Sequence, residues 1–204
     1  MQVEDSPIFC IQPITFEGTL TVTQTRRVFM LRTHFFLFLT CIAPLSMAAE
    51  PSQFARTTID IGTVVTDLDA AVKFYTEGIG FQELKGFQVT AELATAAGLT
   101  DNKPLDVRVL VLGEEPTATK LKLMQVAETT PRSGDNAFIH SHTGFRYLTI
   151  MVTDTAAVLA RLKALGVTPL AQSPVNLKKL VSGKSLTCVK DPDGNLVELI
   201  GPTP

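Results

Sequence analysis

Two histidines with a single residue between them are the first side chains in this sequence whose type and spacing could do chemistry. Histidine is the commonest metal ligand in proteins, so His140 and His142 predict a metal site on one interpretation. Residues 128–145 around them are rich in Thr, Ser, Gly, Asp and Asn, which is typical of a connector with solvated histidines. The connector could also act as a lid over a cavity, with Phe138 and Phe145 contacting a ligand.

Other catalytic signatures are weak or missing. Cys188 lies within an expected strand, where a cysteine usually behaves as a small buried hydrophobic side chain and not as a nucleophile. The sequence has no Ser-His-Asp signature, no glycine-rich phosphate loop and no Cys-x-x-Cys pair. A local motif therefore does not identify a reaction.

The length and net charge of the chain limit the classes of protein to which it can belong. The chain has 204 residues, of which 45% are hydrophobic and 19% charged, and this is enough for one domain with a good core. The net charge is −2 and no basic cluster follows residue 32, which disfavours nucleic acid as a partner.

One pattern of residues occurs twice. Val65–Asp67 reads Val-Thr-Asp, and the same residues return 87 positions later at Val152–Asp154. Each copy follows a strand-like stretch and opens a stretch with helical spacing, which a glycine ends. Thr66 or Asp67 is suited to cap the first helix, and the repeat places Asp154 at the start of the second. The repeat predicts two similar modules packed about an approximate twofold axis, with a pocket between them.

Each copy is predicted to fold as a strand, a helix and three strands, a βαβββ module. In module one, residues 57–127, the helix has a buried stripe formed by Leu68, Ala71, Val72 and Tyr75. Gly78 and Gly80 are expected to stop this helix. Later strands are expected at 81–87, 107–112 and 120–126, with a short extra helix at 89–99.

Module two, residues 146–201, is predicted to repeat this order after the connector. A strand is expected at 147–152, a helix at 154–165 and then three strands, the last two at 185–190 and 196–200. The residues between these two strands are DPDGN, in which proline and glycine favour a tight turn.

Three segments resemble the vicinal oxygen chelate superfamily, which includes glyoxalase I, bleomycin-resistance proteins and extradiol dioxygenases. They are VVTDLDAAVKFYTEGIGF, MVTDTAAVLARLKALGV and KDPDGNLVELIGP, and together they span nearly all of a glyoxalase-like domain at residues 50–204. The resemblance implies an α+β fold in which two βαβββ modules form a curled mixed sheet around a cavity. Many members bind one divalent metal there, through the first and last strand of each module.

The resemblance places those four metal positions at Asp60 and Lys122 in module one and at Tyr147 and Glu198 in module two. Strand alternation supports this assignment. The apolar neighbours of Lys122 and Glu198 suit packing under the helices, so the two charged side chains should face the cavity. The four residues are therefore the candidate ligand-binding set.

Lys122 disfavours a metal in this cavity. Asp60 and Glu198 suit a hard cation, but Tyr147 would need to lose its proton near pH ~10. An ammonium has no lone pair, and it repels a divalent ion by about 8 kcal/mol at ~4 Å and an effective dielectric of ~20. We predict that Lys122 takes the place of the metal, flanked by Asp60 and Glu198. A purely structural role of the four is the alternative.

Three functions remain open. The first is a metal-independent, small-molecule-binding member without a cofactor, which sequesters a ligand or does acid–base catalysis with Lys122 and Glu198. The second is a divalent-metal-dependent lyase, isomerase or dioxygenase, with Asp60, Glu198 and a histidine as ligands. The third is a structural or partner-binding domain with a filled cavity. A homodimer fits all three, because members of this superfamily often pair modules between chains.

Residues 1–49 are predicted to be a signal peptide. The stretch 25–30 contains two consecutive arginines, Arg26 and Arg27, and an apolar run follows at 35–45. Small residues then form a cleavage site. The arginines resemble a twin-arginine export signal, and a general secretory signal that starts at Met30 is the alternative. We expect an exported protein, periplasmic or extracellular, without membrane contact after cleavage. Cys188 would be its only cysteine, so no internal disulfide forms.

Overall fold

The computed structural model describes residues 53–178 and 180–204. The predicted signal peptide, 1–49, lies outside the described residues. Among the residues described, no helix is long and apolar enough to cross a membrane.

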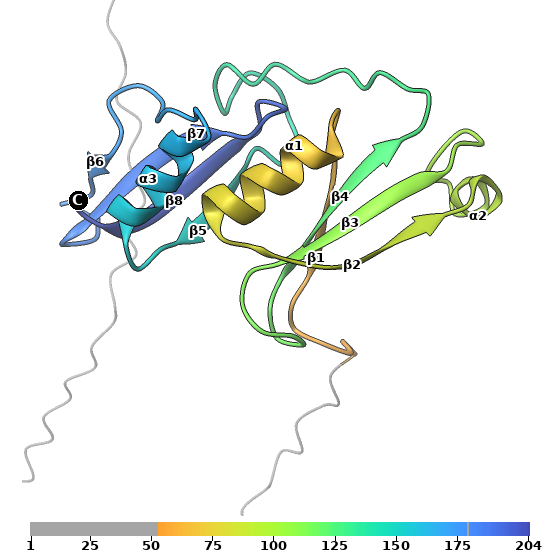
Figure 1. Ribbon diagram of the computed structural model, residues 1–204, viewed down its shortest axis with the longest axis horizontal. Helices are drawn as coiled ribbons and strands as arrows, with labels where there is room; N and C mark the ends of the chain where they lie inside the picture. Colours follow the sequence, from red (N-terminus) through yellow and green to blue (C-terminus); the bar gives the residue numbers. More distant parts are fainter. Residues whose placement is uncertain (1–52, 179) are drawn as a thin grey trace, which may run out of the picture. The chain divides into compact units, whose positions relative to one another are not determined.

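Module one is a four-stranded sheet with the strand order β1-β4-β3-β2 (Figure 1). Strand β1 is parallel to β4, and the other pairs are antiparallel. Its elements are β1 (Asp60–Val64), α1 (Leu68–Lys73), η1 (Phe74–Ile79), β2 (Gln82–Val89), α2 (Ala91–Ala96), β3 (Leu105–Val111) and β4 (Lys120–Val126). The extra helix α2 is shorter than predicted, because the Thr90 hydroxyl caps its start and Gly98, at φ 71°, follows its end.

Module two repeats this order in a second sheet, β5-β8-β7-β6. Its elements are β5 (Tyr147–Met151), α3 (Thr155–Ala164), β6 (Val175–Asn176), β7 (Lys184–Lys190) and β8 (Leu196–Pro202). Strand β6 has only two residues, because Pro174 precedes it and a turn begins at Leu177, whose carbonyl accepts from Leu180 and Val181. The predicted α+β fold of two βαβββ modules is confirmed, with a separate sheet in each module.

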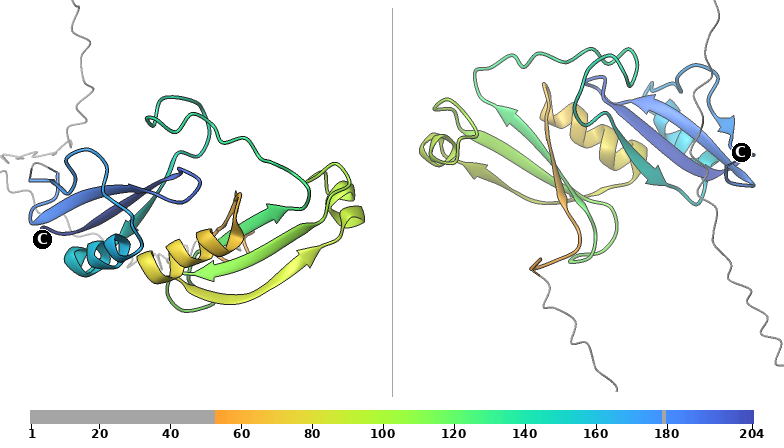
Figure 2. Two further views of the ribbon diagram at one scale, coloured as in Figure 1. Left: turned by 45° about the horizontal axis from the view of Figure 1, so that its top comes forward. Right: turned by 180° about the vertical axis from the view of Figure 1, so that it is seen from behind.

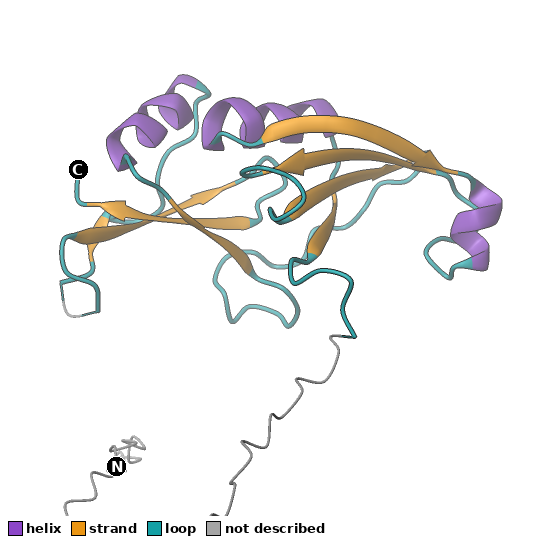
Figure 3. Cartoon of the chain, turned by 90° about the horizontal axis from the view of Figure 1, so that it is seen from below, coloured by secondary structure: helices purple, strands orange, loops and turns teal. Residues whose placement is uncertain are grey.

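The repeated aspartates begin both long helices, as predicted. Asp67 accepts a hydrogen bond from the Ala70 N–H at 3.0 Å, and Asp154 accepts one from Ala157 at 2.9 Å. Each carboxylate thus satisfies an N–H that has no partner within the helix. Both α1 and α3 lie on the same side of the strands (Figure 3). The opposite side of both sheets is therefore free of these helices.

The two modules meet where η1 lies beside α3 (Figure 2). The last turn of η1 is widened, and the N–H groups of Gly80 and Phe81 both donate to the Tyr75 carbonyl. A Cβ on Gly78 would lie 2.9 Å from Leu162 Cδ2, so any larger residue there would push the buried Leu162 side chain aside. The helical residues continue past Gly78 to Ile79 and end at Gly80, at φ 114°, so the prediction is confirmed for Gly80 and wrong for Gly78.

One hydrophobic core extends through both modules. Leu121 and Leu123 of β4 and Val197 and Leu199 of β8 are each at most 2% exposed, which confirms the predicted alternation. The predicted helix stripe is also buried: Leu68, Ala71, Val72 and Tyr75.

A buried hydrogen bond joins the modules at the DPDGN turn. The Tyr75 hydroxyl donates to Asp191 Oδ2 at 3.0 Å, and burial, followed by the charge of Asp191, raises the pKa of Tyr75. Asp191 also accepts from the Asp193 N–H and from two N–H groups of Asn195. The carboxylate is 5% exposed, and these four hydrogen bonds satisfy it.

Removing this hydroxyl should destabilise the fold. We expect Tyr75→Phe to lower the free energy of unfolding by about 1–3 kcal/mol, because Asp191 loses a donor that water cannot easily replace. The other tyrosine is a matched control: Tyr147 is 50% exposed, and its hydroxyl has no hydrogen-bond partner in the described part of the chain. Tyr147→Phe should change the free energy by less than about 0.5 kcal/mol. Urea unfolding of both variants measures the difference, and equal effects would contradict the structural role of Tyr75.

Candidate functional site

Polar and apolar side chains surround a hollow of about 480 Å³ on the helix-free side of module one. We call it the basic pocket. It is lined by Arg56, Asp60, Leu84, Lys85, Phe87, Val109, Glu115, Lys120 and Lys122. The volume is within the range of small-molecule sites, about 300–1,000 Å³.

Asp60 is held between two cations in this pocket. Its Oδ1 accepts from Arg56 Nη2 at 2.6 Å, and its Oδ2 lies 2.8 Å from Lys122 Nζ. The hydrogen bond from Lys122, with a smaller contribution from Arg56, lowers the pKa of the Asp60 carboxyl. Gly62 is the β1 neighbour of Lys122, and it has no side chain to stand beside the lysine. Two predicted site residues are thus in direct contact.

The remaining charges leave the pocket positive. Lys120 pairs with Glu115, and Lys85 is exposed without an ion-pair partner in the described segments. Four basic side chains therefore face two carboxylates, which is an excess of two positive charges.

A β-bulge in β2 builds the apolar wall. Leu84 pairs with Val109 and Phe87 with Val107, so β2 has one more residue than β3 over this stretch. Residues three apart in a regular strand point to opposite faces, whereas the bulge lets Leu84 and Phe87 both line the pocket. The bulge needs Gly86, because a Cβ there would collide with the Val107 carbonyl oxygen.

The corresponding place in module two has different contacts. Glu198 Oε2 accepts a hydrogen bond from the Thr149 hydroxyl at 2.8 Å, and Thr149 is its β5 neighbour. Cys188 lies beside Glu198 on β7 and is half-buried, not fully buried as expected. Burial, followed by the charge of Glu198, raises the pKa of the Cys188 thiol, which disfavours the nucleophilic thiolate.

Tyr147 and Glu198 lie apart from the basic pocket. Tyr147 lines a separate hollow of about 180 Å³, between β1 and β5, together with Ile61 and Phe145. No ion pair links Glu198 with Lys122 in the part of the chain that the structure describes. The structure thus brings together Asp60 and Lys122, and the binding roles assigned to all four residues stay predictions.

Sequence reasoning missed the arginine that organises the connector. Arg146 donates to the carbonyls of Asp135 and Phe138, at 3.0 and 3.2 Å, and its Nη1 lies 2.8 Å from His142 Nε2. His142 Nδ1 lies 2.7 Å from the Asp135 carbonyl, so Nδ1 carries the proton and Nε2 accepts from Arg146. His140 instead stacks on Phe138. The two histidines have different partners, and no sequence motif marked Arg146.

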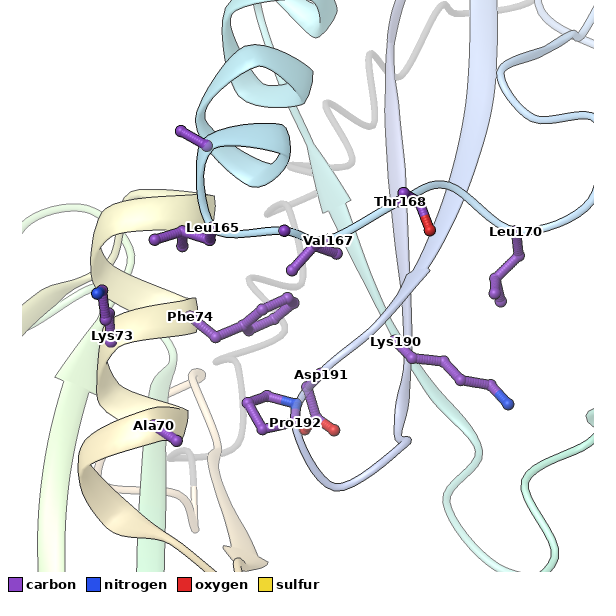
Figure 4. A pocket seen from close by; sticks show the side chains of 12 residues that line it. Ala70, Lys73, Phe74, Leu165, Val167, Thr168, Leu170, Lys190, Asp191 and Pro192 are labelled. Carbon is purple, nitrogen blue, oxygen red and sulfur yellow. The ribbon is translucent and has the colours of Figure 1, made fainter.

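A larger hollow, of about 620 Å³, lies on the helix side of the sheets, between the two long helices and the DPDGN turn (Figure 4). Phe74 and Val167 form part of its apolar lining, and Lys190 extends away from Phe74. Its carboxylate, Asp191, already has four hydrogen-bond donors. Lys73 and Lys190 also line this hollow, but with Asp191 they leave an excess of only one positive charge, against two in the basic pocket.

The sequence profile described as Glyoxalase/Bleomycin resistance protein/Dioxygenase superfamily matches residues 58–199. The chain belongs to this superfamily. The match covers both modules and confirms the resemblance seen in the sequence. A search of curated proteins found no match.

Solved structures of the superfamily share the fold at low sequence identity. A glyoxalase family protein from Bacillus cereus has a TM-score of 0.62 and 18% identity, and the match covers 77% of this chain and all of that one. The trypanothione-dependent glyoxalase I of Leishmania major has a TM-score of 0.52 and 24% identity, with 72% of this chain and 87% of that one covered. A glyoxalase I mutant from Zea mays has a TM-score of 0.54 and 21% identity, over 71% of this chain and 46% of that one.

The donor set around Asp60 does not fit the divalent metal that is usual in this superfamily. Both Asp60 oxygens already contact cations, Arg56 and Lys122. A metal at this carboxylate would stand beside two positive charges, which repel it. Within residues 53–178 and 180–204, no three His, Cys, Asp or Glu side chains gather in a group that could hold a metal.

The bulge offers a test of how the pocket wall is built. We expect Gly86→Ala to lower the free energy of unfolding by about 1–3 kcal/mol, because β2 must move away from the Val107 carbonyl. Gly62→Ala is the control, since its new Cβ would meet only the flexible end of Met124, at 3.0 Å. This control should be neutral or slightly stabilising. Urea unfolding compares the two, and an equal loss in both would count against a required glycine at the bulge.

Proposed function

We propose that this protein is a metal-independent, small-molecule-binding member of its superfamily and that the ligand binds in the basic pocket. The Lys122–Asp60 ion pair, at 2.8 Å, carries the proposal. By the resemblance, its two residues stand at two of the four positions at which related proteins use metal ligands, and Lys122 supplies a positive charge without a metal. An ammonium has three N–H donors, so Lys122 keeps donors for a ligand while it holds Asp60.

Binding is better supported than acid–base catalysis. Asp60 has a lowered pKa and contacts two cations, so it is a weak base. Glu198, the other predicted catalytic residue, accepts from Thr149 and is absent from the pocket lining. A general acid–base pair needs both groups within reach of one reacting atom.

Metal content tests this function. Protein purified without chelator should contain far less than one divalent ion per chain by inductively coupled plasma mass spectrometry. Lys122→Glu should increase the affinity for Mn²⁺, because the repelling ammonium is replaced by a second carboxylate near Asp60. Lys73→Glu, on α1, makes the same charge change on the helix side and should not. One tightly bound ion per wild-type chain would overturn the proposal.

We also propose that the mature protein acts outside the cytoplasm. The supporting observation is the order of charged, apolar and small residues within 1–49. Cell fractionation and intact-mass measurement should find a mature chain that begins close to residue 50. The double substitution Arg26→Lys and Arg27→Lys should block export if the route is the twin-arginine one and spare it if the route is general. Uncleaved protein confined to the cytoplasm would contradict export.

A further inference from the structure

The basic pocket combines two chemistries that together define a class of ligand. Its polar side has an excess of two positive charges, and its other side is apolar: Leu84, Phe87 and Val109. Val109 belongs to a small second core on this face of the sheet, which fixes that part of the wall. Phe87 is 47% exposed, so its ring is available for contact.

Arg56 and Lys122 are held in place by Asp60, but most of their N–H donors have no hydrogen-bond partner among the described residues. Lys122 and Arg56 each have one hydrogen bond to Asp60, and their side chains are 33% and 45% exposed. A guanidinium has five N–H donors and an ammonium three, so several donors remain free at each. Asp60 therefore holds both cations in place and neutralises only one of their two charges.

These features disfavour other ligands. A cation would meet the positive excess, and a bare inorganic anion would leave the apolar wall uncovered. A folded macromolecule does not enter a hollow of about 480 Å³. An organic anion satisfies both sides, because its acidic group pairs with the cations while its body covers the wall.

We infer that the basic pocket selects a small organic anion with an apolar body, bound by Lys122, Arg56 and Lys85 at the acidic group and by Leu84 and Phe87 at the body. This inference rests on the proposed function and adds the chemical class of its ligand. Lys85 enters because the bulge places it in the lining next to this wall.

A pair of isosteric probes tests the charge requirement. With the purified protein, 2-naphthoate should bind at least tenfold more tightly than the neutral 2-naphthamide, by isothermal titration calorimetry at low salt. Lys122→Gln and Lys85→Gln should each weaken 2-naphthoate binding about three- to tenfold, and 150 mM KCl should weaken it as well. Lys73→Gln removes an equal charge from α1 on the helix side and should leave the affinity unchanged.

A separate variant tests how much the apolar wall contributes to binding. Phe87→Ala should weaken both probes by a similar factor, whereas Leu180→Ala, at an exposed side chain outside the basic pocket, should weaken neither. Lys85 is exposed, so Lys85→Gln keeps the charge test valid if Lys122→Gln unfolds.

The outcomes separate the two proposals. Equal affinity for naphthoate and naphthamide, no binding of either probe, or binding that ignores both lysines would overturn the anion inference and leave metal-independent binding standing. Probe binding that is lost with EDTA and restored by Mn²⁺ would overturn the proposed function, whatever the preference between the probes.

Discussion

The hydrogen bond between Tyr75 and Asp191 is the buried polar contact that joins the two modules across their common core. Asp191 orders the turn before β8, and Tyr75 belongs to η1 of the other module. Three donors to the buried Asp191 carboxylate come from its own turn and the fourth from Tyr75, so docking of the modules completes its hydrogen bonding. Arg161 reinforces the docking by donating to the carbonyls of Gly78 and Ile79 at the end of η1. Polar groups thus fix the geometry of an interface that is otherwise apolar.

This docking uses one side of the sheets and leaves the other to the candidate site. Leu121 and Leu123 enter the common core, and Lys122 between them must face away from it. The same division operates in β8 around Glu198. Because one strand serves both purposes, a change of register by one residue would bury the lysine and expose the leucines. The core therefore determines which side chains can reach a ligand.

Much of this arrangement could be predicted from the sequence, because periodicity reports which face of an element is buried. The caps at Asp67 and Asp154 and the faces of β4 and β8 follow from local patterns. The resemblance to relatives pointed to Lys122 and Asp60. The bulge at Gly86 and the contacts of Arg146 could not be predicted, since each depends on backbone irregularities or on carbonyls that only the folded chain brings within reach.

A side chain that is missing in one module and present in the other limits what each module can do. Gly62 adjoins Lys122 in β1, and Thr149 takes the equivalent place beside Glu198 in β5. The threonine hydroxyl occupies one lone pair of Glu198, whereas Gly62 offers Lys122 no side-chain hydrogen-bonding group, and Met124 Cε lies near the place of its missing side chain. The two modules thus share one framework and differ in the polar groups beside each strand pair: Lys122 stands next to Gly62, and Glu198 next to Thr149. The same backbone framework can therefore carry different polar groups on its helix-free side while Leu121, Leu123, Val197 and Leu199 keep the common core unchanged.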